Sequence, residues 1–165
     1  MGRYRPPRPY SSPYITLQGK IKLEDELRYL GYTKRPEVTR ALAAAAAEGD
    51  RSENAEYIYR KKQLREIDSR LQYLVKRLEK LKCIDKIPDD QSRVFFAAWV
   101  DLEDEDGKSI TYRLVGPDEF DVSKGWISID SPVAKALLKK QVGDEVSVVA
   151  PNGEIHYEVM GIRYK

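Results

Sequence analysis

The sequence predicts an antiparallel α-helical coiled-coil hairpin followed by a small α+β domain. Leucine and isoleucine recur at heptad spacing over residues 64–81, a helix-forming segment precedes them after a short turn, and short strand-like runs follow from Val94 onward. Apolar residues at steps of three and four mark one face of a helix, and two such helices joined by a short turn form a hairpin. We expect a flexible tail over residues 1–14, the hairpin over 15–84 with its tip near 48–54, and the second domain over 85–165.

The composition limits the possible functions. The chain has 165 residues, 34% of them charged, and a net charge of only +2, so any nucleic-acid contact must come from local clusters. A single cysteine, Cys83, excludes an internal disulfide and a thiolate zinc cluster and fits a reducing, cytoplasmic compartment. No apolar run approaches the roughly 20 residues that span a bilayer, and the N-terminus has no apolar signal core.

The first fourteen residues are rich in Pro, Arg, Tyr and Ser, a composition that cannot bury a core. They are interpreted either as a disordered extension or as a basic tail that touches phosphates. A helical pattern follows over residues 17–48, with Leu23, Leu27 and Leu30 on one face. Gly31 and Pro36 interrupt it, and proline inside a helix predicts a kink.

Gly49 is suited to end this first helix, and Asp50 or Ser52 is suited to cap the next. In the second helix the apolar residues step by 3, 4, 3, 4 and 3, which is a heptad seam; they are Leu64, Ile67, Leu71, Leu74, Leu78 and Leu81. Each arm of about 30 residues would be roughly 45 Å long.

The C-terminal part predicts a mostly antiparallel sheet with one short helix. Strand-like runs cover residues 94–102, 109–115, 126–129, 145–149 and 155–162, and Asp106-Gly107 and Asn152-Gly153 are hairpin-turn signals. Ser131-Pro132 followed by residues 133–138 indicates a capped helix with proline at its first position.

The candidate chemistry lies at the predicted tip. Asp50 and Glu53 are three residues apart at a helix start. One interpretation is helix capping and compensation of the helix dipole. The other is magnesium chemistry, because Mg²⁺ is often held by one or two carboxylates while water and phosphate oxygens complete its shell. Two acids on an exposed tip would then supply ligands to a metal already held by another macromolecule.

A basic strip follows the tip, with Arg60, Lys61, Lys62 and Arg65. It is interpreted as a solvated helix face or as a phosphate-binding strip. Tyr57 and Tyr59 would stack on a base or pack at the end of the hairpin. Elsewhere the sequence offers one histidine, His156, in a predicted strand, and no phosphate-binding glycine motif.

Three segments carry a family resemblance: GDRSENAEYIYRKKQLREIDSRLQYL, RVFFAAWVDLEDEDG and WISIDSPVAKALLKKQVGDEV. The first closely resembles the hairpin tip and second helix of the bacterial Gre transcript-cleavage factors, of the GreB type. The other two resemble the C-terminal domain of that family, which has an FKBP-like fold. The resemblance covers residues 15–165.

The resemblance implies a mechanism residue by residue. Asp50 and Glu53 are expected to be the catalytic acids that share the second Mg²⁺ of the RNA polymerase active site, while the free chain binds no cofactor. Arg60, Lys61 and Arg65 are expected to contact RNA, and Ser52, Asn54 and Tyr57 to support the tip. Docking at the channel rim is expected from Asp130, Ser131 and Pro132, although a helix cap is the alternative for Ser131.

The partners implied are bacterial RNA polymerase, entered through its secondary channel, and the 3′ end of the nascent RNA, with no membrane and a monomeric chain. The polymerase itself would hydrolyse the backtracked RNA, so the chain is not an enzyme. Both tip acids are intact, which argues against inhibitory relatives that alter the tip. Other hypotheses are a coiled-coil adaptor, a channel inhibitor without cleavage activity, and an FKBP-like prolyl isomerase, whose pocket would use Trp99, Trp126 and Tyr112 unless these pack in the core.

Overall fold

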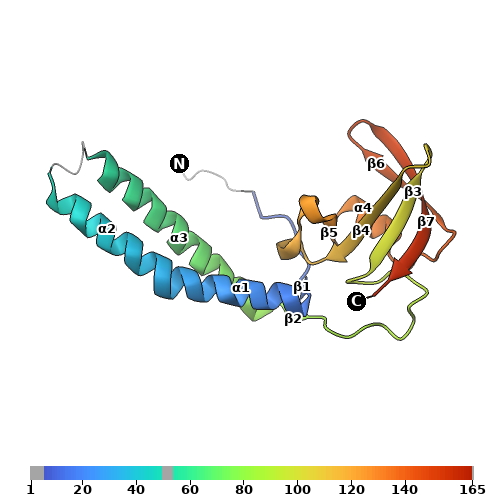
Figure 1. Ribbon diagram of the computed structural model, residues 1–165, viewed down its shortest axis with the longest axis horizontal. Coiled ribbons are helices and arrows are strands. Elements are labelled where there is room, and N and C mark those ends of the chain that lie inside the picture. Colours follow the sequence, from blue (N-terminus) through green and yellow to red (C-terminus); the bar gives the residue numbers. More distant parts are fainter. Residues whose placement is uncertain (1–5, 50–53, 165) are drawn as a thin grey trace. The chain divides into compact units, whose positions relative to one another are not determined.

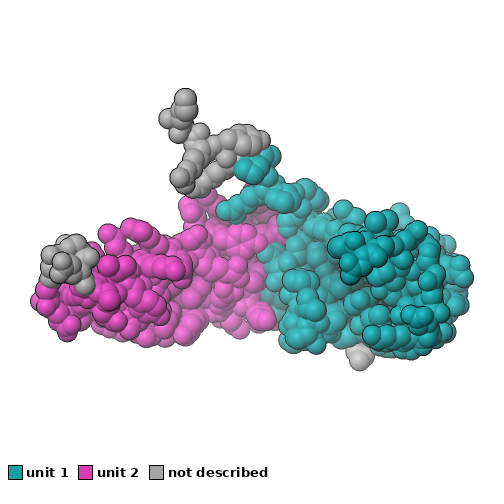
Figure 2. Space-filling view, turned by 90° about the horizontal axis from the view of Figure 1, so that it is seen from above, with its two compact units in different colours: residues 1–19, 82–165 teal, residues 20–81 magenta. Residues whose placement is uncertain are grey.

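A computed structural model describes residues 6–49 and 54–164 (Figure 1). The chain separates into two compact units, shown in different colours in Figure 2: unit 1 comprises residues 1–19 and 82–165, and unit 2 comprises residues 20–81. Both arms of the hairpin, from Leu17 to Lys80, lie within the range 15–84 expected from the sequence. Among the described helices, none combines the length and the apolar composition that a bilayer crossing requires.

Unit 2 is the predicted helical hairpin. Its first arm is continuous through three segments and its second arm is one helix; they are α1 (Leu17–Tyr29), the π-helical turn η1 (Leu30–Lys34), α2 (Arg35–Ala47) and α3 (Ala55–Lys80). Figure 1 shows α2 and α3 side by side in opposite directions. The sequence placed the second helix and its direction correctly, because its heptad pattern is long and uninterrupted.

The interruption expected near Gly31 and Pro36 takes the form of the π-helical turn η1. Arg35 donates its backbone N–H to the carbonyl of Leu30, five residues earlier. Pro36, at the start of α2, has no N–H and cannot continue the ordinary ladder. A π-turn inserts one extra residue into a helix, and π-helical geometry occurs mostly as such single turns inside α-helices.

The leucine seam forms the interior of the hairpin. Ile67 and Leu74 are buried on α3, and Val38 and Ala45 are buried on α2. The remaining seam positions are half-buried, as expected for two helices with solvent on both sides; they are Leu64, Leu71, Leu78 and Leu81. Burial of a full aliphatic side chain contributes about 1.5–3 kcal/mol, so these contacts dominate the stability of unit 2.

Two bidentate ion pairs join the arms at their surface. Arg35 donates to Asp68 over 2.7 and 3.4 Å, and Arg70 donates to Glu26 over 2.6 and 3.0 Å. Both pairs are exposed, so solvent screening leaves each with a small net effect on stability. Their fork geometry instead fixes the register between the two arms.

Unit 1 is built on a five-stranded sheet in the order β5-β4-β3-β7-β6, in which only β4 and β5 are parallel. Its elements are β3 (Trp99–Asp104), β4 (Ser109–Val115), η2 (Pro117–Glu119), η3 (Val122–Lys124), β5 (Trp126–Ser128), α4 (Pro132–Leu137), β6 (Glu145–Ala150) and β7 (Gly153–Arg163). One face of the sheet buries the core together with Ala134 and Leu137 of α4. The predicted turns at Asp106-Gly107 and Asn152-Gly153 join β3 to β4 and β6 to β7.

The first strand begins later than the sequence indicates. Residues 94–102 were expected to be extended, but β3 starts at Trp99. Ala97 has a left-handed backbone with φ of 68°, and Ala98 donates to the carbonyl of Phe95 in a turn. Left-handed alanine is uncommon and leaves no local signal. Val94 is nevertheless buried, in contact with the core.

The N-terminal segment joins unit 1. β1 (Tyr14–Ile15) pairs in parallel with β2 (Lys82–Cys83), which follows α3. Ser12 is buried and donates its backbone N–H and its hydroxyl to the carboxylate of Asp130. The flexible tail expected over residues 1–14 therefore extends too far, since residues 12–14 are held by hydrogen bonds; residues 1–5 lie outside the described residues.

A buried carboxylate secures the residues after β1. Glu119 accepts hydrogen bonds from the backbone N–H and the hydroxyl of Thr16 and from the backbone N–H of Gly116. The Thr16 hydroxyl oxygen also accepts from the backbone N–H of Gly19 and so caps the start of α1. A side chain at Gly19 would lie 2.1 Å from the Glu119 carboxylate, which explains the glycine there. We call Thr16, Gly19, Gly116 and Glu119 the Glu119 clasp.

Candidate functional site

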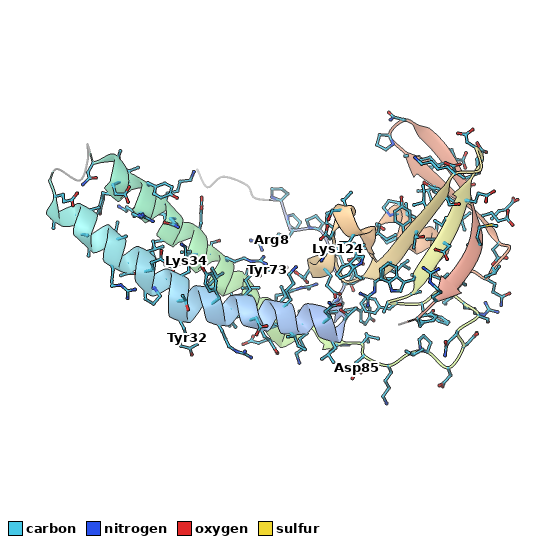
Figure 3. The ribbon with its side chains drawn as sticks, in the orientation of Figure 1. Arg8, Tyr32, Lys34, Tyr73, Asp85 and Lys124 are labelled. Atoms are coloured by element: carbon cyan, nitrogen blue, oxygen red, sulfur yellow. The ribbon has the colours of Figure 1, made fainter. Side chains whose placement is uncertain are left out.

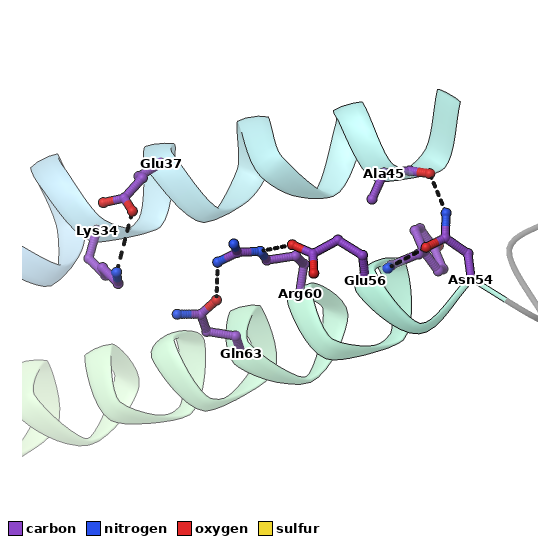
Figure 4. Close-up of polar contacts among 8 residues, drawn as sticks. Lys34, Glu37, Ala45, Asn54, Glu56, Arg60 and Gln63 are labelled. Atoms are coloured by element: carbon purple, nitrogen blue, oxygen red, sulfur yellow. Dashed lines mark hydrogen bonds and ion pairs between the residues drawn. The ribbon is translucent and has the colours of Figure 1, made fainter. Parts of the chain in front are cut away.

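The ends of the two arms at the hairpin turn are tied by Asn54. Its Oδ1 accepts from the backbone N–H of Tyr57 at 3.1 Å and so caps α3, while its Nδ2 donates to the carbonyl of Ala45 at 2.6 Å (Figure 4). The cap expected from Asp50 or Ser52 is therefore provided by Asn54, because α3 begins at Ala55. One amide side chain thus closes the connection between the arms.

The predicted catalytic acids Asp50 and Glu53, and the tip residue Ser52, lie outside the described residues. In the sequence they fall between Ala47, the last residue of α2, and Asn54. The connection that carries them is anchored on both sides by the bond between Asn54 and Ala45. The roles of these residues stay predictions.

Arg60 lies in the polar continuation of the seam, one heptad before buried Ile67. Its Nε donates to Glu56 at 2.7 Å, its Nη1 donates to Gln63 at 3.0 Å, and its guanidinium lies 5.3 Å from the ring centroid of Tyr59. Figure 4 shows the two hydrogen bonds of Arg60, to Glu56 and to Gln63. Arg60 is therefore engaged within its own helix, and its predicted contact with RNA stays a prediction.

Lys61 and Arg65 lie one helical turn apart, so their side chains share a face of α3 that the seam does not occupy. Both are exposed. The ammonium of Lys61 lies 5.8 Å from the ring centroid of Tyr57, within reach of a cation–π interaction. The structure thus separates the predicted RNA contacts into a seam residue, Arg60, and two outward cations.

The segment predicted to dock on the polymerase has internal partners. The hydroxyl of Ser131 accepts from the backbone N–H of Ala134 and caps α4, with Pro132 at the first helical position, as the sequence indicates. Asp130 is half-buried and holds Ser12. Pro132 is exposed, and the docking role of the segment stays a prediction.

The aromatic residues proposed for an isomerase pocket do not share one face of the sheet. Trp99 pairs with Arg113, whereas Tyr112 pairs with Val100 and packs against the core. Neighbouring residues of a strand point to opposite faces, so Trp99 and Trp126 lie on the face away from Tyr112. The hypothesis of one pocket lined by these three residues is wrong.

His156 lies on the exposed side of β7, where its Nδ1 is 2.7 Å from the hydroxyl of Ser147 and its Nε2 is 3.8 Å from Glu105. Acidic residues surround a hollow beside it; they are Glu103, Asp104, Glu105, Glu145 and Glu158. Within residues 6–49 and 54–164, no three such side chains are arranged to hold a metal ion.

Sequence reasoning missed two arrangements. The Glu119 clasp joins residues 103 positions apart, and only Thr16, a good cap just before a predicted helix, signals it. The second is the side-by-side placement of Trp99, Arg113 and Trp126 on three neighbouring strands. A strand arginine indicates only a solvent-facing position, so its burial between two rings has no signal in the sequence.

Two family models match the chain: the N-terminal model of the GreA/GreB transcription elongation factors over residues 13–83, and the C-terminal model over residues 89–164. The chain is 56% identical over 164 residues to transcription elongation factor GreB of Pseudomonas aeruginosa, covering 99% of this chain and 98% of the relative. It is 58% identical over 154 residues to GreB of Yersinia pestis, covering 93% and 90%. The chain belongs to the GreA/GreB family of transcription elongation factors.

Two solved structures of GreA/GreB relatives are also similar to this chain. The crystal structure of GreA factor homolog 1 of Thermus thermophilus shares 25% identity, covers 91% of this chain and 97% of its own, and gives a TM-score of 0.41. The GreA/GreB factor of Nitrosomonas europaea shares 22% identity, covers 93% and 100%, and gives a TM-score of 0.41. The predicted fold class, a helical hairpin followed by a small mixed α+β domain, is confirmed by the helices and the five-stranded sheet of this chain.

Proposed function

We propose that this chain acts on bacterial RNA polymerase in the cytoplasm, entering the secondary channel with its hairpin and stimulating the cleavage of backtracked RNA. The observation that carries the proposal is the match to GreB relatives along almost the whole chain, tip and C-terminal domain included. The hairpin supports it because α3 alone has 26 residues, about 39 Å of helix at 1.5 Å per residue.

The reaction proposed is hydrolysis of an RNA phosphodiester by the polymerase, with this chain as a monomeric cofactor of the reaction. Two carboxylates are too few to hold Mg²⁺ alone, but they can complete the shell of an ion that another macromolecule already binds. Asp50 and Glu53 would orient the attacking water and share the second Mg²⁺ of the polymerase active site. Two metals stabilise the attacking and leaving oxygens in such a displacement.

Asn54 would position the two acids. It fixes the first residue of α3 against the end of α2 through Ala45. The geometry of catalytic groups depends on such support from the structure around them. Asn54 and Tyr57 are thus proposed to support the tip from within, together with Ser52.

The nascent RNA would run along the outward face of α3. Lys61 and Arg65 are exposed on one face and would contact its phosphates without reading sequence. Arg60 would keep the polar end of the seam in place through Glu56 and Gln63, and would reach RNA only after those bonds rearrange. Docking at the channel rim by Asp130, Ser131 and Pro132 belongs to the same proposal.

The test is RNA cleavage in stalled elongation complexes assembled with the purified chain. Asp50→Asn and Glu53→Gln should each reduce the rate at least 100-fold, while competition with the unmodified chain for polymerase stays within about twofold. Glu48→Gln, an exposed acid beside the same turn, is the matched control and should cleave normally. Full cleavage activity in both tip variants would refute the mechanism.

The same assay separates the alternatives. A coiled-coil adaptor would tolerate both substitutions without loss of its activity. A channel inhibitor would bind the polymerase and slow elongation while the unmodified chain fails to stimulate cleavage. A prolyl isomerase would turn over a proline peptide without polymerase.

A further inference from the structure

The outer face of the sheet in unit 1 carries a row of alternating aromatic and cationic side chains. Trp99 on β3, Arg113 on β4 and Trp126 on β5 are direct neighbours in the strand register, so all three side chains lie on one face. The guanidinium of Arg113 lies 5.4 Å from the ring centroid of Trp99 and 5.1 Å from that of Trp126. Beside it, the ammonium of Lys124, labelled in Figure 3, lies 4.8 Å from the Trp126 ring centroid.

Among the residues that the structure describes, no carboxylate forms an ion pair with the buried guanidinium of Arg113. The residue is 9% exposed, and its Nε has no hydrogen-bond partner within the described part of the chain. Arginine stays protonated in proteins, so this position keeps a full positive charge. Two ring faces offer part of the compensation, but a buried charge usually has a hydrogen-bonded partner as well.

The neighbouring cations have carboxylates of their own. Arg163, beside Trp99 in the register, forms an ion pair with Asp101. Lys124 lies 3.9 Å from a carboxylate oxygen of Asp121. Arg113 is therefore the member of the row whose charge lacks an acid among the described residues. A partner would therefore need to supply one negative charge at this surface, not several.

We infer that Arg113 receives a single carboxylate from the protein surface of RNA polymerase, an aspartate or glutamate side chain that enters between the edges of Trp99 and Trp126. The inference depends on the proposed function only in naming RNA polymerase as the partner. A nucleic-acid backbone fits less well, because it requires a strip of uncompensated cations and open ring faces for stacking. Here cations already cover the ring faces, and two of the three cations have a carboxylate beside them.

The arrangement suits such a contact physically. An arginine fork takes a carboxylate through two parallel hydrogen bonds, and exclusion of water strengthens charge-assisted bonds. Flanking tryptophan rings shelter the pair, as the residues around an interface hot spot do, and Trp and Arg are enriched at such spots. In the free chain, the unsatisfied guanidinium of Arg113 raises the free energy of the folded state. The hydrogen bonds to the partner's carboxylate remove this penalty on docking.

The experiment measures affinity for RNA polymerase by fluorescence anisotropy of the labelled full chain, together with RNA cleavage and thermal unfolding. Arg113→Met, which keeps the apolar stem between the rings, should weaken binding at least tenfold. Cleavage at saturating concentration should match the unmodified chain, because the tip is intact. The melting temperature should stay the same or rise, since an unpaired buried charge is removed.

Lys108→Met is the matched control, because it removes one positive charge from an exposed turn of the same unit and should leave binding unchanged. Arg113→Lys should also lose affinity, since an ammonium cannot form the fork. Unchanged binding in both Arg113 variants would overturn the inference, and so would a fall in melting temperature with binding retained, which would mark a purely structural role. Failure of the unmodified chain to bind polymerase would instead refute the proposed function.

Discussion

The carboxylate of Glu119 lies 3.0 Å from the backbone nitrogen of Thr16 and also accepts the hydroxyl proton of the same residue. A third donor, the backbone N–H of Gly116, lies 2.9 Å from Oε2. A charged group deep in unit 1 is thus satisfied by three donors, two of them from Thr16, the residue just before α1. This contact explains why the first nineteen residues group with the C-terminal domain rather than with the hairpin.

Glu119→Gln should destabilise unit 1 by about 1–3 kcal/mol, because an amide presents a donor where the carboxylate accepts three hydrogen bonds. The measurement is urea unfolding followed by the fluorescence of the two tryptophans, both of which are in unit 1. Glu154→Gln, at an exposed position of β7, is the control and should change the unfolding free energy by less than about 0.5 kcal/mol. Equal curves for the two variants would contradict the role given to the Glu119 clasp.

Gly19→Ala should also be destabilising, by about 1–3 kcal/mol, because the new methyl group would lie 2.1 Å from the Glu119 carboxylate. Gly31→Ala offers a matched comparison in the same arm. Its methyl group would meet only Leu71, at 3.9 Å, and alanine suits a helix better than glycine, so stability should rise by about 0.5–1 kcal/mol. Thermal unfolding by circular dichroism would show opposite shifts, and shifts of the same sign would contradict the packing described.

Asn54→Ala should loosen the turn end of the hairpin, because it removes both the cap of α3 and the bond to Ala45. The expected cost is about 1–2 kcal/mol, seen as faster amide hydrogen exchange in the first turn of α3. Asn54→Asp keeps the acceptor for the Tyr57 N–H and loses the donor to Ala45, so its exchange should be intermediate. Unchanged exchange in the alanine variant would mean that the amide does not hold the arms together.

Tyr164 gives a prediction for alkaline pH. Its hydroxyl donates to the carbonyl of Arg93 and accepts from the backbone N–H of Phe95, and burial raises the pKa of Tyr164 above the usual 10.0 despite the hydrogen bond from Phe95. The neutral form is favoured in the folded state, so this contribution is complete below pH 10 and is lost as pH rises through the raised pKa. Tyr164→Phe should flatten the fall in stability above pH 10, measured by urea unfolding across pH 8–11. A fall of the same steepness in both proteins would contradict this assignment.

The features that the sequence predicts best are those with local periodicity. The heptads of α3, the two glycine hairpin turns and the Ser131 cap each depend on residues within a few positions of one another, and the structure contains all of them. The Glu119 clasp depends on a contact across 103 positions, for which hydrophobic patterns carry no information. Ala97 is a second case that local patterns do not predict. The surrounding fold imposes a left-handed backbone on it, although alanine rarely adopts one.

The candidate site divides in the same way. The acids and cations near the tip stand out in the sequence because charged residues cluster at the predicted turn and in the first part of the second helix. The use of Asn54 as the cap was not foreseen, because Asp50 and Ser52 are equally good capping residues and only the exact start of α3 decides among them. For Arg113, the sequence carries no signal of burial, because the two tryptophans that flank the side chain come from strands that the sheet order brings together.

The pairing of β1 with β2 has a consequence for how such chains can diverge. Tyr14 lies opposite Lys82 and Ile15 opposite Cys83, so the place where the polypeptide departs toward the helices and the place where it comes back are hydrogen-bonded neighbours. The helical hairpin between them is therefore an insertion whose two ends are held together by the pairing of β1 with β2. Whole heptads could be added to or removed from both arms, or the arms exchanged for those of a relative, while the register of β1 and β2 stays the same. Arm length and attachment can therefore evolve independently.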